Sequence, residues 1–554
     1  MKKPSIKAPK LKAPQLKLPR VGGSAEPGTE ASGAGSVART TQSLLAAAVV
    51  LAAVFGIAEL RPPVTPAKAA PAGAATTAQV ERTTAVCPQP LQDLTGTTAL
   101  TLFSPAGAKA AGGTAYLSDV APPAAAPATP APAASAPATP APSGSAAPAA
   151  PAAPSDARLS LAKPGVPVTG PAANNDTAPG TVAVATGGYA PGFTVGQTTV
   201  VTDPANAGMS GLTCAPSGTS FWFAGASTDG SRTDYVSLVN ADAAPAVVDL
   251  KFFGDKGPVD VDAANGMTIA PGASQAVRLN TLVKGVKDLA VHVVARSGRV
   301  GAALHTSDGG KGADWLPAST DPAPTAVLPG IPGDTTNAHL VVAAPADDDA
   351  DLKIQISGKN GWFTPAGHES IHVKAGMVNA VDLDKITRGE VGALRLTPSD
   401  PAHQTPVVAG LRIDRGQNGK TDEAWISGAA PVGKRASVSD NRGNNTGTLY
   451  LTAADTAAKV RITASAGNNG GTPATKDLDI PAGATVSLPT LEPAGLNGTY
   501  GLTVETLSGG PVLAARMLAV TTKDIPMFTI QSLRDDHSTV QVPQSAADPA
   551  VLVR

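Results

Sequence analysis

The sequence predicts an all-β protein in which an N-terminal transmembrane helix precedes tandem antiparallel β-sandwich repeats of the immunoglobulin or fibronectin type III kind. Three observations lead to this fold class. The 554 residues include 58 Gly and 52 Pro but only 3% aromatic residues, which is typical of many turns and short strands. After residue 60, apolar and polar residues alternate in short runs without helical periodicity. Finally, similar runs recur about every hundred residues.

The recurrence is clearest in three small apolar blocks that contain Ala302, Ala409 and Ala514. These alanines lie 107 and 105 residues apart. A large aromatic residue follows each block, at Trp315, Trp425 and Phe528. About seven short alternating runs per copy fit an antiparallel sandwich with one buried sheet face and one solvated face. No copy contains the Cys…Trp…Cys pattern of a true immunoglobulin domain.

The repeats and the composition divide the chain into expected segments. These are a basic cytoplasmic tail at 1–40, a transmembrane helix at 41–60, a tether at 61–86, an N-terminal β module at 87–214 with a disordered Pro/Ala-rich insertion at 119–155, sandwich repeats at 215–322, 323–432 and 433–540, and a C-terminal tail at 541–554.

The segment at 41–60 is apolar except for Glu59 at its edge, and about 20 such residues span a bilayer core. The basic residues lie before it, so the positive-inside rule places the N-terminus in the cytoplasm and the bulk outside. The expected location is therefore a single-pass cell membrane protein with a signal anchor. The alternative is a secreted protein, released after cleavage near Ala67-Lys68-Ala69.

The chain has two cysteines, Cys87 and Cys214, which are 127 residues apart. An isolated pair in an exported chain favours a disulfide over a metal site, because a metal needs further ligands nearby. This bond would make the Pro/Ala-rich run an insertion inside the N-terminal module.

Several short motifs resemble the actinobacterial family of unknown function DUF5719. They are the N-terminal apolar span, Cys87-Pro88, the later Cys214-Ala215-Pro216, and the run from Phe221 to Gly225 that reads FWFAG. The resemblance covers most of residues 80–540. It implies a secreted or membrane-anchored envelope protein of high-GC Gram-positive bacteria, and it implies no activity.

One literal catalytic motif is present, because His368, Glu369 and His372 match the H-E-x-x-H of zinc proteases. Two His four residues apart converge on one metal only when they share a helix. The alignment of Ile371–Gly376 with a strand and turn around Ile480 predicts an extended segment instead. We therefore assign no catalytic residue, no metal site and no cofactor to the chain.

Three other patterns receive structural interpretations. The acidic run from Asp347 to Asp351 lacks the alternation and terminal Glu of a calcium loop, so we expect a solvated turn. In the run Phe221-Trp222-Phe223, alternation would direct the tryptophan away from the core face of a strand. The recurrence of Trp315 and Trp425 at equivalent positions favours core closure over a binding site.

These observations favour a non-enzymatic envelope scaffold or interaction protein, anchored to the membrane through 41–60. The alternative function is a cell-wall polysaccharide-binding module, and a degenerate hydrolase ranks last. Lys plus Arg (42) nearly equals Asp plus Glu (43), so no overall positive field would attract nucleic acid. Expected partners are therefore the membrane and a wall glycan or another envelope protein.

Overall fold

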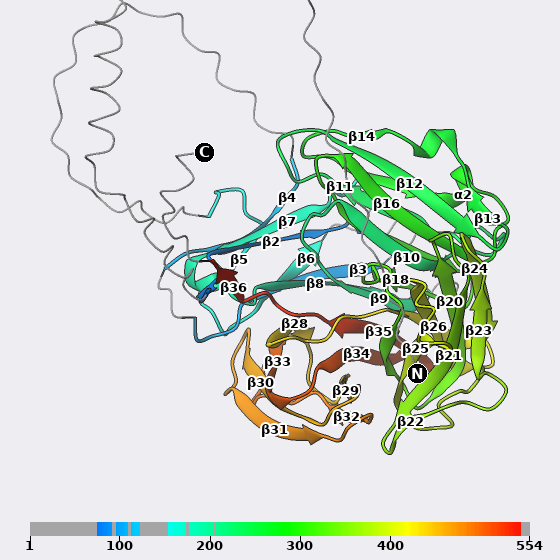
Figure 1. Cartoon of the computed structure of the whole chain (residues 1–554). Coiled ribbons are helices and arrows are strands. Elements are labelled where there is room, and N and C mark those ends of the chain that lie inside the picture. Colours follow the sequence, from blue (N-terminus) through cyan, green and yellow to red (C-terminus); the bar gives the residue numbers. More distant parts are fainter. Residues whose placement is uncertain are drawn as a thin grey trace, which may run out of the picture. The chain divides into compact units, whose positions relative to one another are not determined.

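The computed structural model describes residues 75–90, 96–108, 112–121, 153–172, 177–203 and 207–543 (Figure 1). The expected cytoplasmic tail (1–40) and transmembrane helix (41–60) lie outside these residues, as do 122–152 of the Pro/Ala-rich insertion. Within the described ranges, no helix is long and apolar enough to cross a membrane. The prediction of an all-β chain is confirmed for the described part, where every pairing between strands is antiparallel.

The strands group into four modules, each with two sheets. We call them module N (82–213), module 1 (220–316), module 2 (326–427) and module 3 (435–533). In module N, the first sheet has the order β2 (Arg82–Cys87), β7 (Thr181–Thr186), β4 (Ala115–Asp119) and β5 (Leu159–Ser160). Its second sheet has the order β6 (Val168–Ala172), β3 (Thr97–Phe103), β8 (Thr194–Val201) and β9 (Gly208–Thr213).

Module 1 repeats this arrangement. Its first sheet has the order β10 (Ser220–Ala226), β16 (Leu289–Ser297), β12 (Ala246–Gly254) and β13 (Gly257–Val259), with β14 (Met267–Ile269) also on β12. Its second sheet has the order β15 (Ser274–Arg278), β11 (Tyr235–Val239), β17 (Gly301–Asp308) and β18 (Gly312–Leu316).

Modules 2 and 3 have the same order again. The first sheet of module 2 has the order β19 (Ala326–Ile331), β25 (Gly392–Pro398), β21 (Ala350–Gly358) and β22 (Gly361–Phe363), with β23 (Ser370–Val373) also on β21. Its second sheet has the order β24 (Met377–Asp382), β20 (Thr335–Ala344), β26 (Val408–Gln417) and β27 (Lys420–Ser427). The first sheet of module 3 has the order β28 (Arg435–Asn441), β33 (Tyr500–Gly509), β30 (Ala458–Gly467) and β31 (Ala474–Ile480). Its second sheet has the order β32 (Thr485–Pro489), β29 (Gly447–Ala453), β34 (Val512–Thr522) and β35 (Ile525–Leu533).

The strand register supports the sequence repeat. The three alanines that define the repeat occupy equivalent strands and pair with equivalent partners: Leu238 with Ala302, Val342 with Ala409, and Leu451 with Ala514. Module N was not recognised as a copy in the sequence, yet its strand order is the same. The reason is the long insertion between β4 and β5, which interrupts the spacing.

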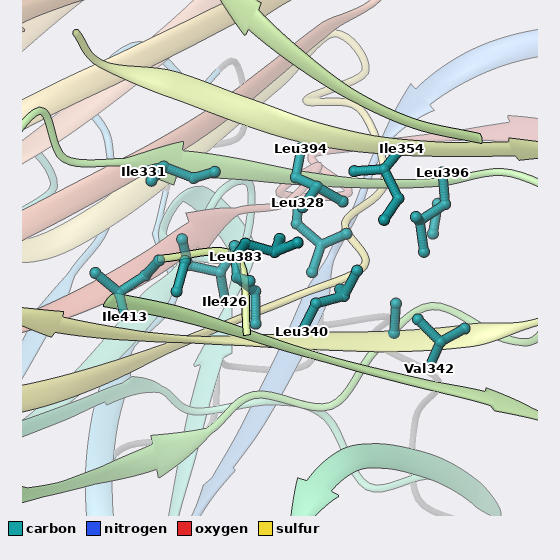
Figure 2. Close-up of a cluster of buried hydrophobic side chains, with 14 of the residues drawn as sticks. Leu328, Ile331, Leu340, Val342, Ile354, Leu383, Leu394, Leu396, Ile413 and Ile426 are labelled. Carbon is teal, nitrogen blue, oxygen red and sulfur yellow. The ribbon is translucent and has the colours of Figure 1, made fainter. Parts of the chain in front are cut away.

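Alternation explains why these segments form strands with one buried face. In β21, Leu352, Ile354 and Ile356 are buried, whereas Asp351 and Lys353 between them are exposed. Leucine and isoleucine side chains from both sheets of module 2 meet in a common core (Figure 2). Each fully buried side chain of this size contributes roughly 1.5–3 kcal/mol.

The modules contact one another in a closed cycle. The first strand of each module packs on the central strands of the next: β10 on β20 and β26, β19 on β29 and β34, and β28 on β3 and β8 of module N. Val86 of β2 packs with Val239 of β11 in the same way, which completes the cycle. The closure also brings together the last strands β9, β18, β27 and β35, each of which contacts the last strands of the two adjacent modules.

A small two-stranded sheet joins the two ends of the described chain. In it, β1 (Thr76–Gln79) pairs with β36 (Thr539–Val542). Residues 76–86, which the sequence assigned to a tether, therefore form β1 and most of β2. The segment assigned to the C-terminal tail likewise starts inside β36. The local signal was a run of threonines and valines, which the sequence reading did not use.

Candidate functional site

Two buried carboxylates tie the four modules together where their last strands meet. Asp422 of β27 accepts hydrogen bonds from the backbone N–H of Met209 in module N (3.0 Å), of Phe528 in module 3 (2.8 Å) and of Glu423 (3.0 Å). Asp314 of β18 accepts from the Gly211 N–H (2.9 Å). Burial raises the pKa of both carboxyl groups, and these N–H donors oppose the rise.

Thr529 completes this network between modules. Its hydroxyl oxygen lies 3.1 Å from each carboxylate oxygen of Asp314, so module 3 is joined to module 1. We call Asp314, Asp422 and Thr529 the hub. All three side chains are buried. Because a buried polar group without a partner is costly, the hub holds its strands at fixed positions.

Apolar side chains beside the hub also cross between modules. Trp425 of module 2 belongs to the core of module 1, where Gly225 faces its ring. A side chain at Gly225 would overlap that ring, and this residue also has a φ of +126°, which favours glycine. Phe528 of module 3 lies in the core of module 2, and Trp315 of module 1 packs on Val201 of module N. These aromatics close the joints between modules and not the cores of their own repeats.

A polar cavity of about 440 Å³ lies between modules 1 and 2. Its wall carries charged groups of both signs, namely Asp229, Arg232, Lys287, Asp288, Asp308, Lys311, His339, Asp382, Asp384, Arg412 and Asp414. This cavity is our candidate functional site, because it gathers charged side chains from strands of two modules at one place.

Two arginines form the inner wall of the polar cavity. Arg232 donates to both oxygens of Asp234 at 3.1 and 3.0 Å, and Arg412 donates to Asp414 at 2.9 Å. Burial alone would lower the pKa of Arg232, but the carboxylates of Asp234, Glu423 and other neighbours more than offset this and raise it. Both guanidinium groups therefore remain charged inside the protein.

Glu423 lies behind this wall and is fully buried. Burial raises the pKa of its carboxyl group to about 7, although Arg232 and Arg412 lower it. The Thr306 hydroxyl donates to its Oε1 at 3.3 Å. Because Glu423 does not line the cavity, it can exchange a proton near neutral pH without touching a molecule bound there.

A histidine connects the two modules across the polar cavity. His339 of β20 places Nε2 2.7 Å from Asp288 of module 1 and Nδ1 2.7 Å from Asp382 of module 2. Only the imidazolium form donates from both nitrogens at once. Burial would raise the pKa of Asp382, but the hydrogen bond and charge of His339 lower it.

Asp308 lines the cavity with one carboxylate oxygen in an ion pair, while its other oxygen is buried. Its Oδ2 pairs with Lys311 at 2.8 Å, whereas its buried Oδ1 has no hydrogen-bond partner among the described residues. Chemically, the cavity can hold a hydroxyl-rich or zwitterionic molecule, because carboxylate acceptors and guanidinium donors face the same space.

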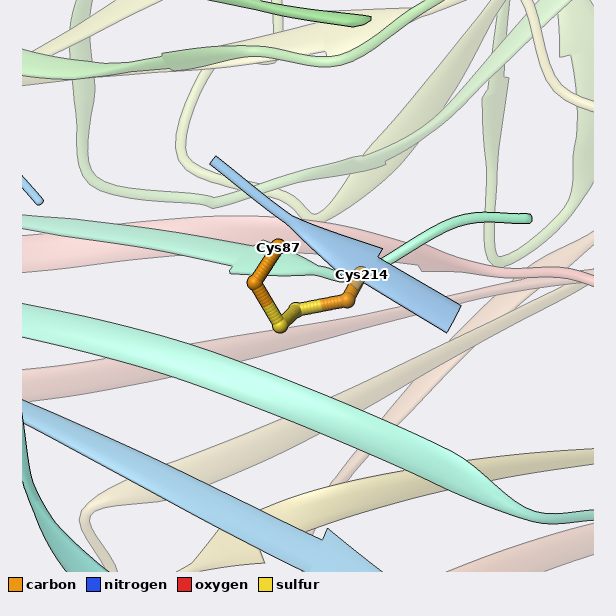
Figure 3. Close-up of a disulfide and its surroundings, with 2 residues drawn as sticks. All are labelled: Cys87 and Cys214. Carbon is orange, nitrogen blue, oxygen red and sulfur yellow. A yellow bond between two sulfur atoms is a disulfide. The ribbon is translucent and has the colours of Figure 1, made fainter. Parts of the chain in front are cut away.

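The predicted disulfide is present (Figure 3). Cys87 at the end of β2 is bonded to Cys214, directly after β9, with their Cα atoms 4.7 Å apart. The bond joins the two sheets of module N and lies in its core. The disulfide therefore stabilises module N and takes no part in the polar cavity, which lies between modules 1 and 2.

The prediction of a strand is confirmed for the second half of the H-E-x-x-H segment, which lies in β23 (Ser370–Val373). His368 and Glu369 lie in the turn before β23, and His372 lies within that strand. His372 is half exposed, and its Nδ1 lies 2.8 Å from Asp351. A strand does not bring the two histidines onto one metal in the way that a helix would, and among the described residues no group of three metal-ligating side chains gathers.

Two further predictions are confirmed. The acidic run forms an exposed turn before β21. On β10, Phe223 lies in the core of module 1, while Trp222 lies on the opposite face and stacks on His292 with ring centroids 3.7 Å apart.

The residues of the polar cavity were missed by the sequence reading. Arg232, His339 and Arg412 come from three different strand regions, far apart in sequence, so no local spacing connects them. A usable signal was the interruption of apolar alternation by the charges of β26 and β27, at Arg412, Asp414, Asp422 and Glu423. Charged residues inside otherwise apolar strands indicate a buried polar network.

Comparison with known protein families identifies a match. A family model, described as a family of unknown function (DUF5719), matches residues 168–490, which is more than half of the chain. The matched region starts at β6 of module N and ends after β32 of module 3, so it includes all of modules 1 and 2. No match is found among the curated proteins.

Proposed function

The chain belongs to the family of unknown function DUF5719, and from this premise we propose that it is a non-enzymatic, membrane-anchored scaffold or interaction protein of the cell envelope. The observation that carries the proposal is the closed cycle of modules around the hub. Buried hydrogen bonds and contacts between modules join the four modules into one compact unit, and a compact unit of this kind suits the presentation of surfaces to partners.

We also propose that each module is a β-sandwich of the immunoglobulin or fibronectin type III kind. The shared order of strands in two sheets supports this, as does one apolar core per module. The sandwich repeat then occurs four times, because module N has the order of the other three.

The proposed location is outside the cytoplasm, with the anchor at 41–60 and the N-terminus inside the cell. The disulfide supports an oxidising compartment, and the basic flank before residue 41 supports the orientation. Secretion after signal cleavage is the alternative. Protease added to intact protoplasts should remove residues beyond about 61 and spare the N-terminal tail; cleavage of the tail with protected modules would contradict the orientation.

The hydrogen-bond and ion-pair partners of the buried charged groups support a role without catalysis. Arg232 and Arg412 are paired with carboxylates, and the hub carboxylates accept backbone hydrogen bonds. Substitution Glu423→Gln keeps the shape of a buried acid whose pKa is raised to about 7. If the chain is a scaffold, this variant should restore a deletion strain as well as the wild type, whereas deletion of 41–60 should not.

The result that contradicts the scaffold is loss of restoration by Glu423→Gln in a protein that is folded and present at the wild-type level. This outcome would indicate proton transfer as part of the function. The matched control is Glu390→Gln, which changes an exposed glutamate that pairs with Lys359.

A polysaccharide-binding function is the second candidate, and the polar cavity favours it. Carboxylates such as Asp308 and the guanidinium of Arg412 line this cavity and supply acceptors and donors of the kind that bind sugar hydroxyl groups. Purified wall polysaccharide should then bind the full chain and bind Asp308→Asn at least several-fold more weakly. Equal binding by the variant, or no binding by the wild type, would remove this candidate.

A further inference from the structure

A second cavity, of about 490 Å³, opens where modules N, 1 and 3 meet. Its wall is mainly apolar and includes Leu212, Phe221, Phe223, Val239, Trp315 and Leu316. The volume lies within the range of sites that bind small molecules, about 300–1,000 Å³.

Arg534 brings a positive charge to this apolar cavity. It follows β35 directly, lines the cavity, and donates a hydrogen bond to the carbonyl oxygen of Ala318. Its side chain is open to solvent, yet the surrounding protein lowers the pKa of its guanidinium by desolvation, and no carboxylate opposes that effect.

The nearby carboxylates are already occupied. Asp536 accepts hydrogen bonds from Arg435 Nε at 2.6 Å and from the Ser437 hydroxyl at 3.0 Å. Asp535 accepts from the His537 backbone N–H at 2.7 Å. Among the described residues, Arg534 therefore has no ion-pair partner, although a guanidinium in an apolar environment gains strongly from one.

Other donors on the wall also lack partners. Arg82, at the start of β2, lines the cavity and forms no ion pair with the described residues. Trp315 Nε1 and Gln531 Nε2 are buried in the wall without a hydrogen-bond partner. The wall thus combines apolar surface with unsatisfied donors and two unpaired positive charges, and the carboxylates on it, Asp535 and Asp536, already accept hydrogen bonds.

We propose that this cavity binds an anionic amphiphile, a molecule with one apolar chain and a carboxylate or phosphate head group. The chain lies along Phe221, Phe223 and Leu212, and the head group pairs with Arg534, assisted by Arg82. Guanidinium groups recognise carboxylate and phosphate with the same two-pronged geometry, so both heads fit. The inference does not depend on the scaffold role, because it concerns a different cavity and a different measurement.

The test is a calorimetric titration of the full chain with soluble probes that share one chain length. Dodecanoate and dodecyl phosphate carry the two anionic heads, dodecanol is neutral and dodecyltrimethylammonium is cationic. All are used below their micelle concentrations. We expect saturable one-to-one binding of at least one anionic probe, weaker binding of dodecanol, and the weakest binding of the cation. Comparison of the two anions shows which head the site prefers.

Variants separate the charge from the fold. Arg534→Gln should weaken binding of the anions by about tenfold to a hundredfold while leaving dodecanol unchanged. Arg534→Lys should retain part of the affinity, because it keeps the charge but loses the planar fork. Arg461→Gln is the control, since Arg461 is an exposed arginine paired with Asp477.

Three outcomes would overturn the proposal. They are no saturable binding of either anion, equal affinity for the anionic and cationic probes, and unchanged affinity of folded Arg534→Gln for the anions. Thermal unfolding of each variant without probe establishes that it is folded. Inorganic phosphate alone serves as a head group without a chain, and equally tight binding of phosphate would also contradict the amphiphile.

Discussion

Modules N and 2 have the same strand order but are stabilised in different ways. The core of module N contains four alanines, Ala85, Ala115, Ala183 and Ala185, together with the disulfide. The core of module 2 has about twice as many buried residues, in which leucine, isoleucine and valine pack with six alanines, and residues of module 3 extend it. The same topology can therefore be held with a covalent cross-link where the apolar core is small, or by apolar burial alone where it is large.

The largest expected effect comes from removal of the disulfide in module N. A cross-link that closes a 127-residue separation stabilises a chain by about 4 to 5 kcal/mol in the chain-entropy account. The double variant Cys87→Ala/Cys214→Ala should lose a similar amount in urea unfolding, and exchange of backbone amides should rise first in module N. If amide exchange rises first in module 2, the claim that the disulfide chiefly stabilises module N is contradicted. Reductant should not affect the double variant.

The hub should show the next largest effect. Asp422→Ala leaves the N–H groups of Met209, Phe528 and Glu423 without their acceptor, and each buried orphan costs about 1–3 kcal/mol. We expect a loss of about 3 kcal/mol or more in the free energy of unfolding. The control Asp524→Ala removes an exposed carboxylate paired with Lys420 and should leave the unfolding midpoint unchanged. Equal midpoints for both variants would contradict the hub.

The joint between modules 1 and 2 should depend on pH through Glu423. Its pKa is raised from 4.5 to about 7 in the fold, so between these values the folded chain holds a proton that the unfolded chain releases. The contribution of Glu423 to the free energy of unfolding is therefore fully present below about pH 4.5, and it falls by up to about 3 kcal/mol as the pH rises to about 7. Urea unfolding of Glu423→Gln should show a shallower slope than the wild type, because Asp314 and Asp422, whose pKa values are also raised, remain, whereas Glu390→Gln should retain the full slope. A wild-type slope in both would contradict the assignment.

The smallest effect is expected at the H-E-x-x-H segment, in the exposed part of module 2. Replacement of His368, Glu369 and His372 by Ala should leave metal content and melting temperature unchanged, because they lie on an exposed turn and strand. Elemental analysis of the purified wild type checks this. Stoichiometric zinc that is lost in the triple variant would show that the segment binds metal in spite of its extended form.

The sequence predicted local structure better than long-range arrangement. Apolar alternation in segments such as β21 predicted strands. The recurrence of Ala302, Ala409 and Ala514 predicted the three later modules. The disulfide could be predicted because Cys87 and Cys214 have no other candidate partner. These are signals that each strand or pair carries by itself.

The joints between modules carried no comparable signal. Trp425 and Phe528 are large apolar residues of the kind found in cores. The sequence does not reveal that each enters the core of a neighbouring module and not that of its own. The polar cavity depends on Arg232, His339 and Arg412, which meet only because the cycle closes. Closure is a property of the whole set of contacts, so it could not be derived from one repeat.

The closed cycle is the central claim, and the pairing of β1 with β36 allows it to be tested directly. Ala78 faces Val540 in this pair. In the full chain, the double variant Ala78→Cys/Val540→Cys should form an intrachain disulfide under mild oxidation, which peptide mass spectrometry identifies. Each single variant is the control. Reduced thiols or only interchain bonds in the double variant would show that the ends lie apart and that the modules form an open array.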